Sequence, residues 1–144
     1  MKEYSDPRMH TAEHLLNQTM VRMFGCGRAF SSHIEKKKSK CDYRFSRPLT
    51  EEETAELERQ VNAVIASNLP VREVFYSRED AAVLDLARLP EGAAGDGLRV
   101  ILIGDYDACP CIGPHVNSTG EIGGFRIVSS SFEDGVLRVR FKLA

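Results

Sequence analysis

The chain has 144 residues, of which 42% are hydrophobic and 28% charged, and its formal net charge is −2. These proportions are typical of a soluble globular protein that buries a core without needing disulfides or a metal for that purpose. They exclude a nonspecific, strongly basic nucleic-acid binder, and no apolar run is long enough to span a membrane. The N-terminus has no secretory signal pattern, and the four cysteines lack a disulfide-framework spacing. We therefore expect one cytoplasmic domain over residues 1–144, with neither a membrane nor DNA as partner; the pattern predicts no oligomeric state.

Two helices are predicted from their capping residues and apolar periodicity. The first covers about residues 7–24, because the carboxylate of Asp6 can cap free backbone N–H groups and a proline is tolerated in the first turn. The second covers about residues 51–68, starting from a capping box made by Thr50 and Glu53.

Short alternating or apolar runs predict strands between and after these helices. We expect a hairpin at 29–35 and 40–47, single strands at 71–76 and 98–103, and a second hairpin at 125–128 and 136–141. Residues 98–103 are the most apolar run and predict a central, buried strand. A short helix is expected from 77 or 78 to 86, followed by a turn-rich connector over 90–97. The fold class is therefore α+β, a mostly antiparallel sheet packed with a few helices.

Three of the four histidines belong to two pairs of metal-binding residue types. His10 and His14 lie one turn apart on the first helix, and Cys111 and His115 lie four residues apart in a loop rich in glycine and proline. Three nitrogens and one sulfur suit a tetrahedral zinc ion. We predict one zinc site from His10, His14, Cys111 and His115, with Cys109 as a possible substitute for Cys111.

Two other kinds of chemistry compete with this interpretation. Cys111 could be a thiol nucleophile activated by His115 or by a helix histidine, which requires a thiolate that no metal holds. The helix motif also differs from that of zinc proteases, whose catalytic Glu directly follows the first His. Here Thr11 occupies that place and Glu13 comes later, so a protease is not predicted.

Basic residues gather in one short segment. Six of the nineteen Lys and Arg residues fall within residues 36–47, beginning with Lys36, Lys37 and Lys38. An isolated run of this kind is usually a solvated loop. It would contact phosphates if the substrate is RNA.

The motifs together resemble a known family. They are residues 10–16 (His-Thr-Ala-Glu-His-Leu-Leu), Val61-Asn62, Arg99-Val100, and the pattern Cys111-x-Gly113-x-His115-Val116-x-x-Thr119-Gly120-Glu121-Ile122-Gly123-x-Phe125. This set is similar to the editing domain of alanyl-tRNA synthetase, which also stands alone in the AlaX-type trans-editing proteins and is related to the threonyl-tRNA synthetase editing domain. The resemblance covers essentially residues 8–144.

The resemblance implies a function and its residues. It implies an aminoacyl-tRNA deacylase, a carboxylic ester hydrolase, acting on Ser-tRNA(Ala) and as a second substrate on Gly-tRNA(Ala). Zinc on His10, His14, Cys111 and His115 would form the catalytic centre. The substrate-binding residues would be Thr11, Asp42, Gly113, Lys36, Lys37 and Lys38, which contact the acceptor end of the tRNA.

This chain departs from the family pattern beside the predicted metal. The family commonly has Cys-Gly-Gly-Thr-His where residues 111–115 are Cys-Ile-Gly-Pro-His, so a hydroxyl and a glycine are lost. The hairpin at 29–47 is also short and lacks the usual Gln and Gly-Ser. These departures leave open an alternative: a zinc-stabilised module that binds the tRNA acceptor stem without hydrolysis.

Overall fold

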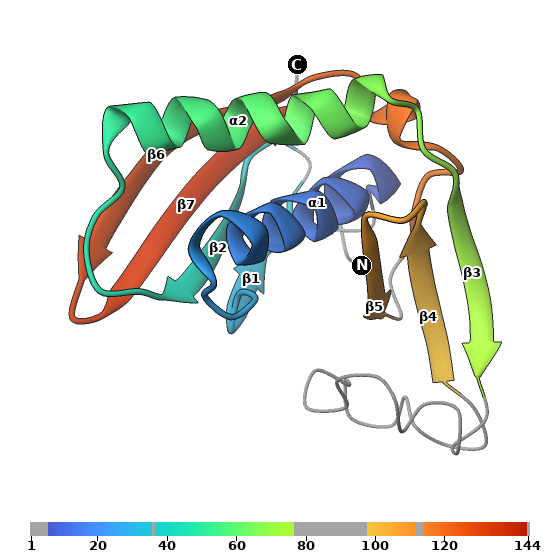
Figure 1. The fold of residues 1–144 in the computed structure, drawn as a ribbon, viewed down its shortest axis with the longest axis horizontal. Coiled ribbons are helices and arrows are strands. Elements are labelled where there is room, and N and C mark those ends of the chain that lie inside the picture. Colours follow the sequence, from blue (N-terminus) through green and yellow to red (C-terminus); the bar gives the residue numbers. More distant parts are fainter. Residues whose placement is uncertain (1–5, 36, 77–97, 112–113, 144) are drawn as a thin grey trace.

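The part of the chain that the structure describes folds into two α-helices and two antiparallel sheets (Figure 1). The computed structural model describes residues 6–35, 37–76, 98–111 and 114–143. In chain order the elements are α1 (Pro7–Phe24), β1 (Ser31–His33), β2 (Ser39–Arg44), α2 (Glu51–Ala66), β3 (Val71–Tyr76), β4 (Leu98–Ile103), β5 (Asp107–Pro110), the 3-10 helix η3 (Thr119–Ile122), β6 (Phe125–Glu133) and β7 (Val136–Leu143). The α+β fold class is confirmed.

The helix boundaries follow from the predicted caps. Asp6 accepts a hydrogen bond from the backbone N–H of Arg8, and α1 ends at Gly25, whose φ of 68° is left-handed. Both hydrogen bonds of the Thr50–Glu53 capping box are present at the start of α2. Helix α2 ends at Ala66, two residues before the predicted end.

The sheet arrangement differs from the prediction in one respect. One sheet was expected, whereas the structure has a four-stranded sheet in the order β1-β2-β7-β6 and a three-stranded sheet in the order β3-β4-β5. β4 is central in the smaller sheet, as its apolar run predicted, whereas the edge strand β5 was not predicted. The predicted short helix at 77–86 and the connector at 90–97 lie outside the described residues.

One core joins both helices to the inner face of the four-stranded sheet. In Figure 1 both helices lie on the same side of this sheet. Five side chains of β2 and β7 have no exposed area: Cys41, Tyr43, Leu137, Val139 and Phe141. They belong to one hydrophobic cluster with Leu15 and Leu16 of α1 and Leu57 and Val61 of α2. Neither α1 nor α2 covers the other face of this sheet.

Two polar side chains, Asn62 and Thr119, connect the segment after His115 to the region of α2. The Asn62 side chain donates to the carbonyl oxygen of Phe125 and accepts from its N–H, both at 2.9 Å. The Thr119 hydroxyl accepts from the N–H of Leu69 and lies 3.0 Å from the carbonyl oxygen of Val64. These bonds hold the segment that follows His115. No helix among the described residues has the length and apolarity needed to cross a membrane.

Candidate metal centre

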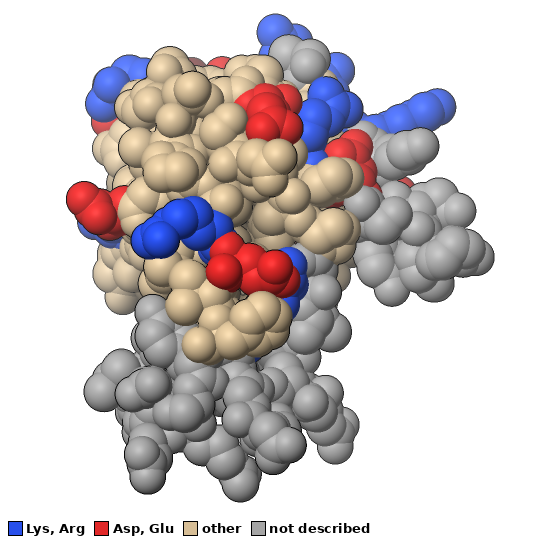
Figure 2. All heavy atoms as spheres, turned by 90° about the vertical axis from the view of Figure 1, so that its right-hand side faces the viewer, with Lys and Arg blue, Asp and Glu red and all other residues tan. Residues whose placement is uncertain are grey.

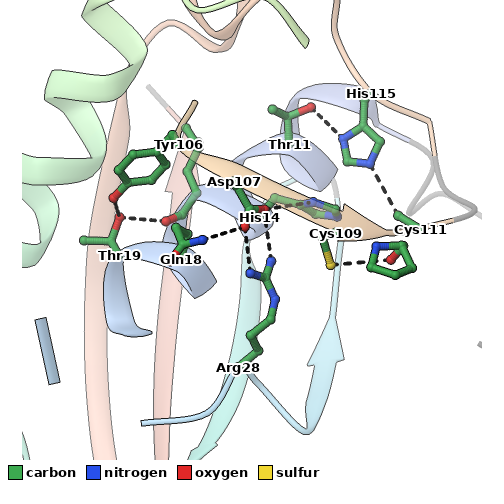
Figure 3. Close-up of polar contacts among 12 residues, drawn as sticks. Thr11, His14, Gln18, Thr19, Arg28, Tyr106, Asp107, Cys109, Cys111 and His115 are labelled. Atoms are coloured by element: carbon green, nitrogen blue, oxygen red, sulfur yellow. Dashed lines mark hydrogen bonds and ion pairs between the residues drawn. The ribbon is translucent and has the colours of Figure 1, made fainter. Parts of the chain in front are cut away.

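Three of the four predicted ligands come together between α1 and the segment after β5. The ligand atoms of His14, Cys111 and His115 all lie within 4.8 Å of one another. His115 Nε2 lies 3.4 Å from Cys111 Sγ, and the His14 and His115 rings are 4.5 Å apart, edge to face (Figure 3). Segments about one hundred residues apart in the sequence therefore supply two imidazoles and a thiol to one point.

His10 lies beside this group without belonging to it. Its ring centroid is 6.2 Å from that of His115, and it is one helical turn before His14 on α1. Its place as a fourth ligand stays a prediction.

The Thr11 hydroxyl determines which ring nitrogen of His115 carries the hydrogen. Its buried hydroxyl lies 3.1 Å from the carbonyl oxygen of Pro7, which can only accept, so the hydroxyl hydrogen is directed there. The oxygen then accepts from the N–H of Val116 at 3.2 Å and from Nδ1 of His115 at 2.9 Å. With the hydrogen on Nδ1, the lone pair of a neutral His115 is on Nε2, the nitrogen that faces Cys111.

Asp107 faces the other imidazole. Its side chain has no exposed area and accepts hydrogen bonds from Gln18 at 2.8 Å and from two nitrogens of Arg28 at 2.9 and 3.2 Å. His14 Nδ1 lies 3.6 Å from Asp107 Oδ2, an ion-pair distance (Figure 3). A carboxylate in this place favours a hydrogen on Nδ1 and leaves Nε2 of His14 for a ligand.

The two imidazoles have opposite pKa shifts. Burial disfavours a charged His14, but Asp107 and Cys111 outweigh burial and raise its pKa to about 9. Burial, together with the nearby His14 and His10, lowers the pKa of His115 to about 2. His115 is therefore a neutral ligand at pH 7, whereas a metal binding to His14 must displace a proton.

Asp107 remains ionised despite its burial. Burial alone would raise its pKa, but His14 and Arg28 outweigh this effect and lower it. Two nitrogens and one sulfur form a donor set that fits zinc. Each of the two imidazoles also has a hydrogen-bonding or charged neighbour on its other ring nitrogen. The residues present thus fit the predicted metal.

The backbone around Cys111 is held by β4. Arg99 Nη1 donates to the carbonyl oxygen of Cys111 at 2.8 Å, and the N–H of Cys111 donates to the carbonyl oxygen of Arg99 at 3.3 Å. Arg99 also forms an ion pair with Glu73 of β3. Cys109 is buried and its thiol donates to the carbonyl oxygen of Pro110 at 3.4 Å, outside the three-donor group.

The predicted substrate-binding residues are not gathered at one place. Asp42, on β2, accepts two hydrogen bonds from Arg138 on β7, at 2.8 and 2.9 Å. Lys37 and Lys38 are exposed in the turn between β1 and β2. Lys36 and Gly113 lie outside the described residues.

The interpretation of the sequence missed Asp107 and Arg28. Arg28 is 79 positions away from Asp107, so no local pattern connects them. The one available signal was an acidic residue four positions before Cys111, because metal-binding histidines commonly have a carboxylate neighbour.

Comparison with known proteins finds one matching family model. Residues 98–140 match the family model described as the Threonyl and Alanyl tRNA synthetase second additional domain. This segment contains β4, β5, the Cys111–His115 segment and most of the C-terminal hairpin.

The similar curated proteins are alanine–tRNA ligases. The chain is 36% identical to that of Caldicellulosiruptor saccharolyticus over 132 residues, which are 90% of this chain and 15% of the ligase. It is 32% identical to that of Petrotoga mobilis over 140 residues and 34% identical to that of Aeropyrum pernix over 145 residues, covering 96% and 97% of this chain and 16% of each ligase. The chain is therefore related to the alanyl-tRNA synthetases, although it spans only about a sixth of their length.

Proposed function

We propose that this chain is a zinc-dependent deacylase that hydrolyses mischarged tRNA(Ala) in trans, with Ser-tRNA(Ala) as main substrate and Gly-tRNA(Ala) as second substrate. The observation that carries the proposal is the convergence of His14, Cys111 and His115, in a chain related to alanyl-tRNA synthetases. None of the four cysteines, all of which lie among the described residues, forms a disulfide, which suits the reducing cytoplasm in which tRNA is charged.

Each residue of the candidate metal centre has a proposed role in the hydrolysis. Zinc held by His14, Cys111 and His115, with His10 as the proposed fourth ligand, would supply Lewis-acid charge at the ester. Thr11 and Asp107 orient the two imidazoles, and Arg99 holds the Cys111 carbonyl. The hydrolysis itself adds water to the ester carbonyl carbon, and the bond to the ribose oxygen breaks. The ribose oxygen takes a proton and becomes a hydroxyl, and serine and tRNA leave.

An aminoacyl ester requires little further activation. Positioning the 3′ end of the tRNA and a water molecule therefore supplies much of the catalysis. Editing also addresses a limit of recognition, because a pocket for a small apolar side chain discriminates weakly against an added hydroxyl.

The proposal is tested by deacylation of Ser-tRNA(Ala) with protein of determined zinc content, using Ala-tRNA(Ala) and Ser-tRNA(Thr) as controls. We expect selective release of serine that disappears when zinc is removed and in Cys111→Ala. Cys26→Ala is the matched control, because that thiol lies outside the three-donor group, bonded to the Met20 carbonyl oxygen, and it should keep full activity. No release by fully zinc-loaded protein on any of these substrates would contradict the proposal.

The same experiment distinguishes the alternative, a zinc-stabilised module that binds the acceptor stem. Pro114 in place of the family's threonine favours that alternative, because proline has no hydroxyl to offer at the site. In that case Cys111→Ala would lower stability, and the wild-type protein would bind tRNA without turnover.

A further inference from the structure

The outer face of the four-stranded sheet is strongly basic. Alternation along the strands puts every second residue of β2, β7 and β6 on the side opposite the core. Among the described strand residues, six cations share this side with two acidic residues, Asp42 and Glu133. We call these six the basic face: Lys40, Arg44, Arg126, Arg138, Arg140 and Lys142.

The charge is concentrated on this face and is not a property of the whole chain, whose net charge is −2. The side of the molecule that carries β3 and β4, seen directly in Figure 2, is mostly uncharged, and its acidic and basic side chains are interspersed. All six cations of the basic face are at least partly exposed, and neither helix of the described part of the chain covers them.

The strand register places like charges opposite one another. Lys40 pairs with Arg140, and Arg126 pairs with Lys142. Directly opposed like charges destabilise a sheet, so these pairs are costly in the isolated protein. An anion bound between them would remove that cost. Only Arg138 has an acidic residue opposite it, Asp42.

Arg140 is also held in place for binding. It donates to the Ser129 and Ser131 hydroxyls at 3.2 and 3.4 Å, which fixes its guanidinium over the sheet. It lines a surface pocket of about 280 Å³ together with Lys38 and Lys40, and one acidic residue, Glu35, also lines this pocket. An oriented guanidinium loses less side-chain freedom when it binds a phosphate.

This pocket lies at the start of β2, where the two faces of the sheet meet. Ser39, which also lines the pocket, is buried on the core side, and its hydroxyl contacts Met9 Sδ of α1 at 3.5 Å. Lys40 and Arg140, by contrast, face outward.

We propose that the basic face binds the phosphate backbone of the tRNA acceptor stem. That the bound polyanion is RNA rests on the proposed function. That the basic face binds a polyanion at all rests on the charge of the face alone. A regularly spaced phosphate backbone suits a row of cations on neighbouring strands.

The test measures binding of an uncharged acceptor-stem hairpin RNA at several salt concentrations, so that hydrolysis plays no part. We expect Lys142→Glu and Arg140→Glu each to weaken binding at least about tenfold at low salt and to reduce the slope of log K against log salt by about one. Lys142→Glu should leave thermal stability equal or higher, because it converts a like-charge pair with Arg126 into an opposite-charge pair. If Arg140→Glu does not fold, the binding measurement uses Arg140→Gln, whose side chain can still hydrogen-bond the serine hydroxyls.

The matched control is Arg59→Glu, a charge reversal at an exposed position of α2, which should leave RNA binding and its salt slope unchanged. Unchanged binding in both basic-face variants would overturn the proposal. So would tight, salt-dependent binding to phosphatidylserine vesicles that the RNA does not displace. If the protein binds RNA through this face but releases no serine, the inference stands and the proposed hydrolysis fails.

Discussion

The Thr11 hydroxyl offers the sharpest test of how the candidate metal centre is built. Thr11→Val keeps the volume of the side chain but removes its oxygen. The N–H groups of His115 and Val116 then lose their acceptor; Val116 is buried, whereas His115 is partly exposed. An unpaired buried donor costs about 1–3 kcal/mol and a partly exposed one costs less, so the two together should lower the free energy of unfolding by about 2–4 kcal/mol.

Thr11→Ser is the matched variant, because it keeps the oxygen and removes only a buried methyl group. Its cost should be about 1 kcal/mol. The order of stability should therefore be wild type, then serine, then valine, measured by urea denaturation of the metal-free proteins. Because Nδ1 of His115 also loses its partner, zinc affinity in competition with a chelator should fall about 10–100-fold in Thr11→Val and little in Thr11→Ser. A valine variant as stable as the serine variant, with unchanged zinc affinity, would refute the role assigned to the hydroxyl.

Two further predictions concern the carboxylates of the two sheets. Asp107→Asn leaves Arg28 without its buried counter-ion and should lower the free energy of unfolding by about 3–5 kcal/mol. The control Asp105→Asn, at an exposed position two residues earlier, should change it by less than about 0.5 kcal/mol. Similar denaturation curves for both variants would contradict the role of Asp107. Hydrogen bonds from Arg138 outweigh desolvation and lower the pKa of Asp42 in the folded protein. The stability that this carboxylate contributes is therefore fully present above its unfolded pKa, near 4, and is lost as the pH falls through its folded pKa. Stability should therefore fall less between about pH 5 and pH 3 in Asp42→Asn than in the wild type, and equal pH slopes would count against this ion pair.

Local features of the sequence determined most of the secondary structure. Asp6, Gly25 and the Thr50–Glu53 box act within a few residues of themselves, so the predicted helix boundaries agree with the structure to within two residues. The turn at Asp134 and Gly135 was equally clear, because both adopt positive φ values, 54° and 79°, that a tight hairpin requires. The resemblance to the alanyl-tRNA synthetases also followed from the sequence, through the His14 and Cys111–His115 motifs.

Tertiary structure decided what those motifs do together. Only packing of α1 against the segment after β5 brings His14 within reach of Cys111 and His115, and it leaves His10 beside the group. The role of Asp107 depends on Arg28, 79 positions away, and a pairing over that distance leaves no periodicity in the sequence. The basic face depends in the same way on register, because strands far apart in the chain align their cations only when β2 and β6 pair with β7.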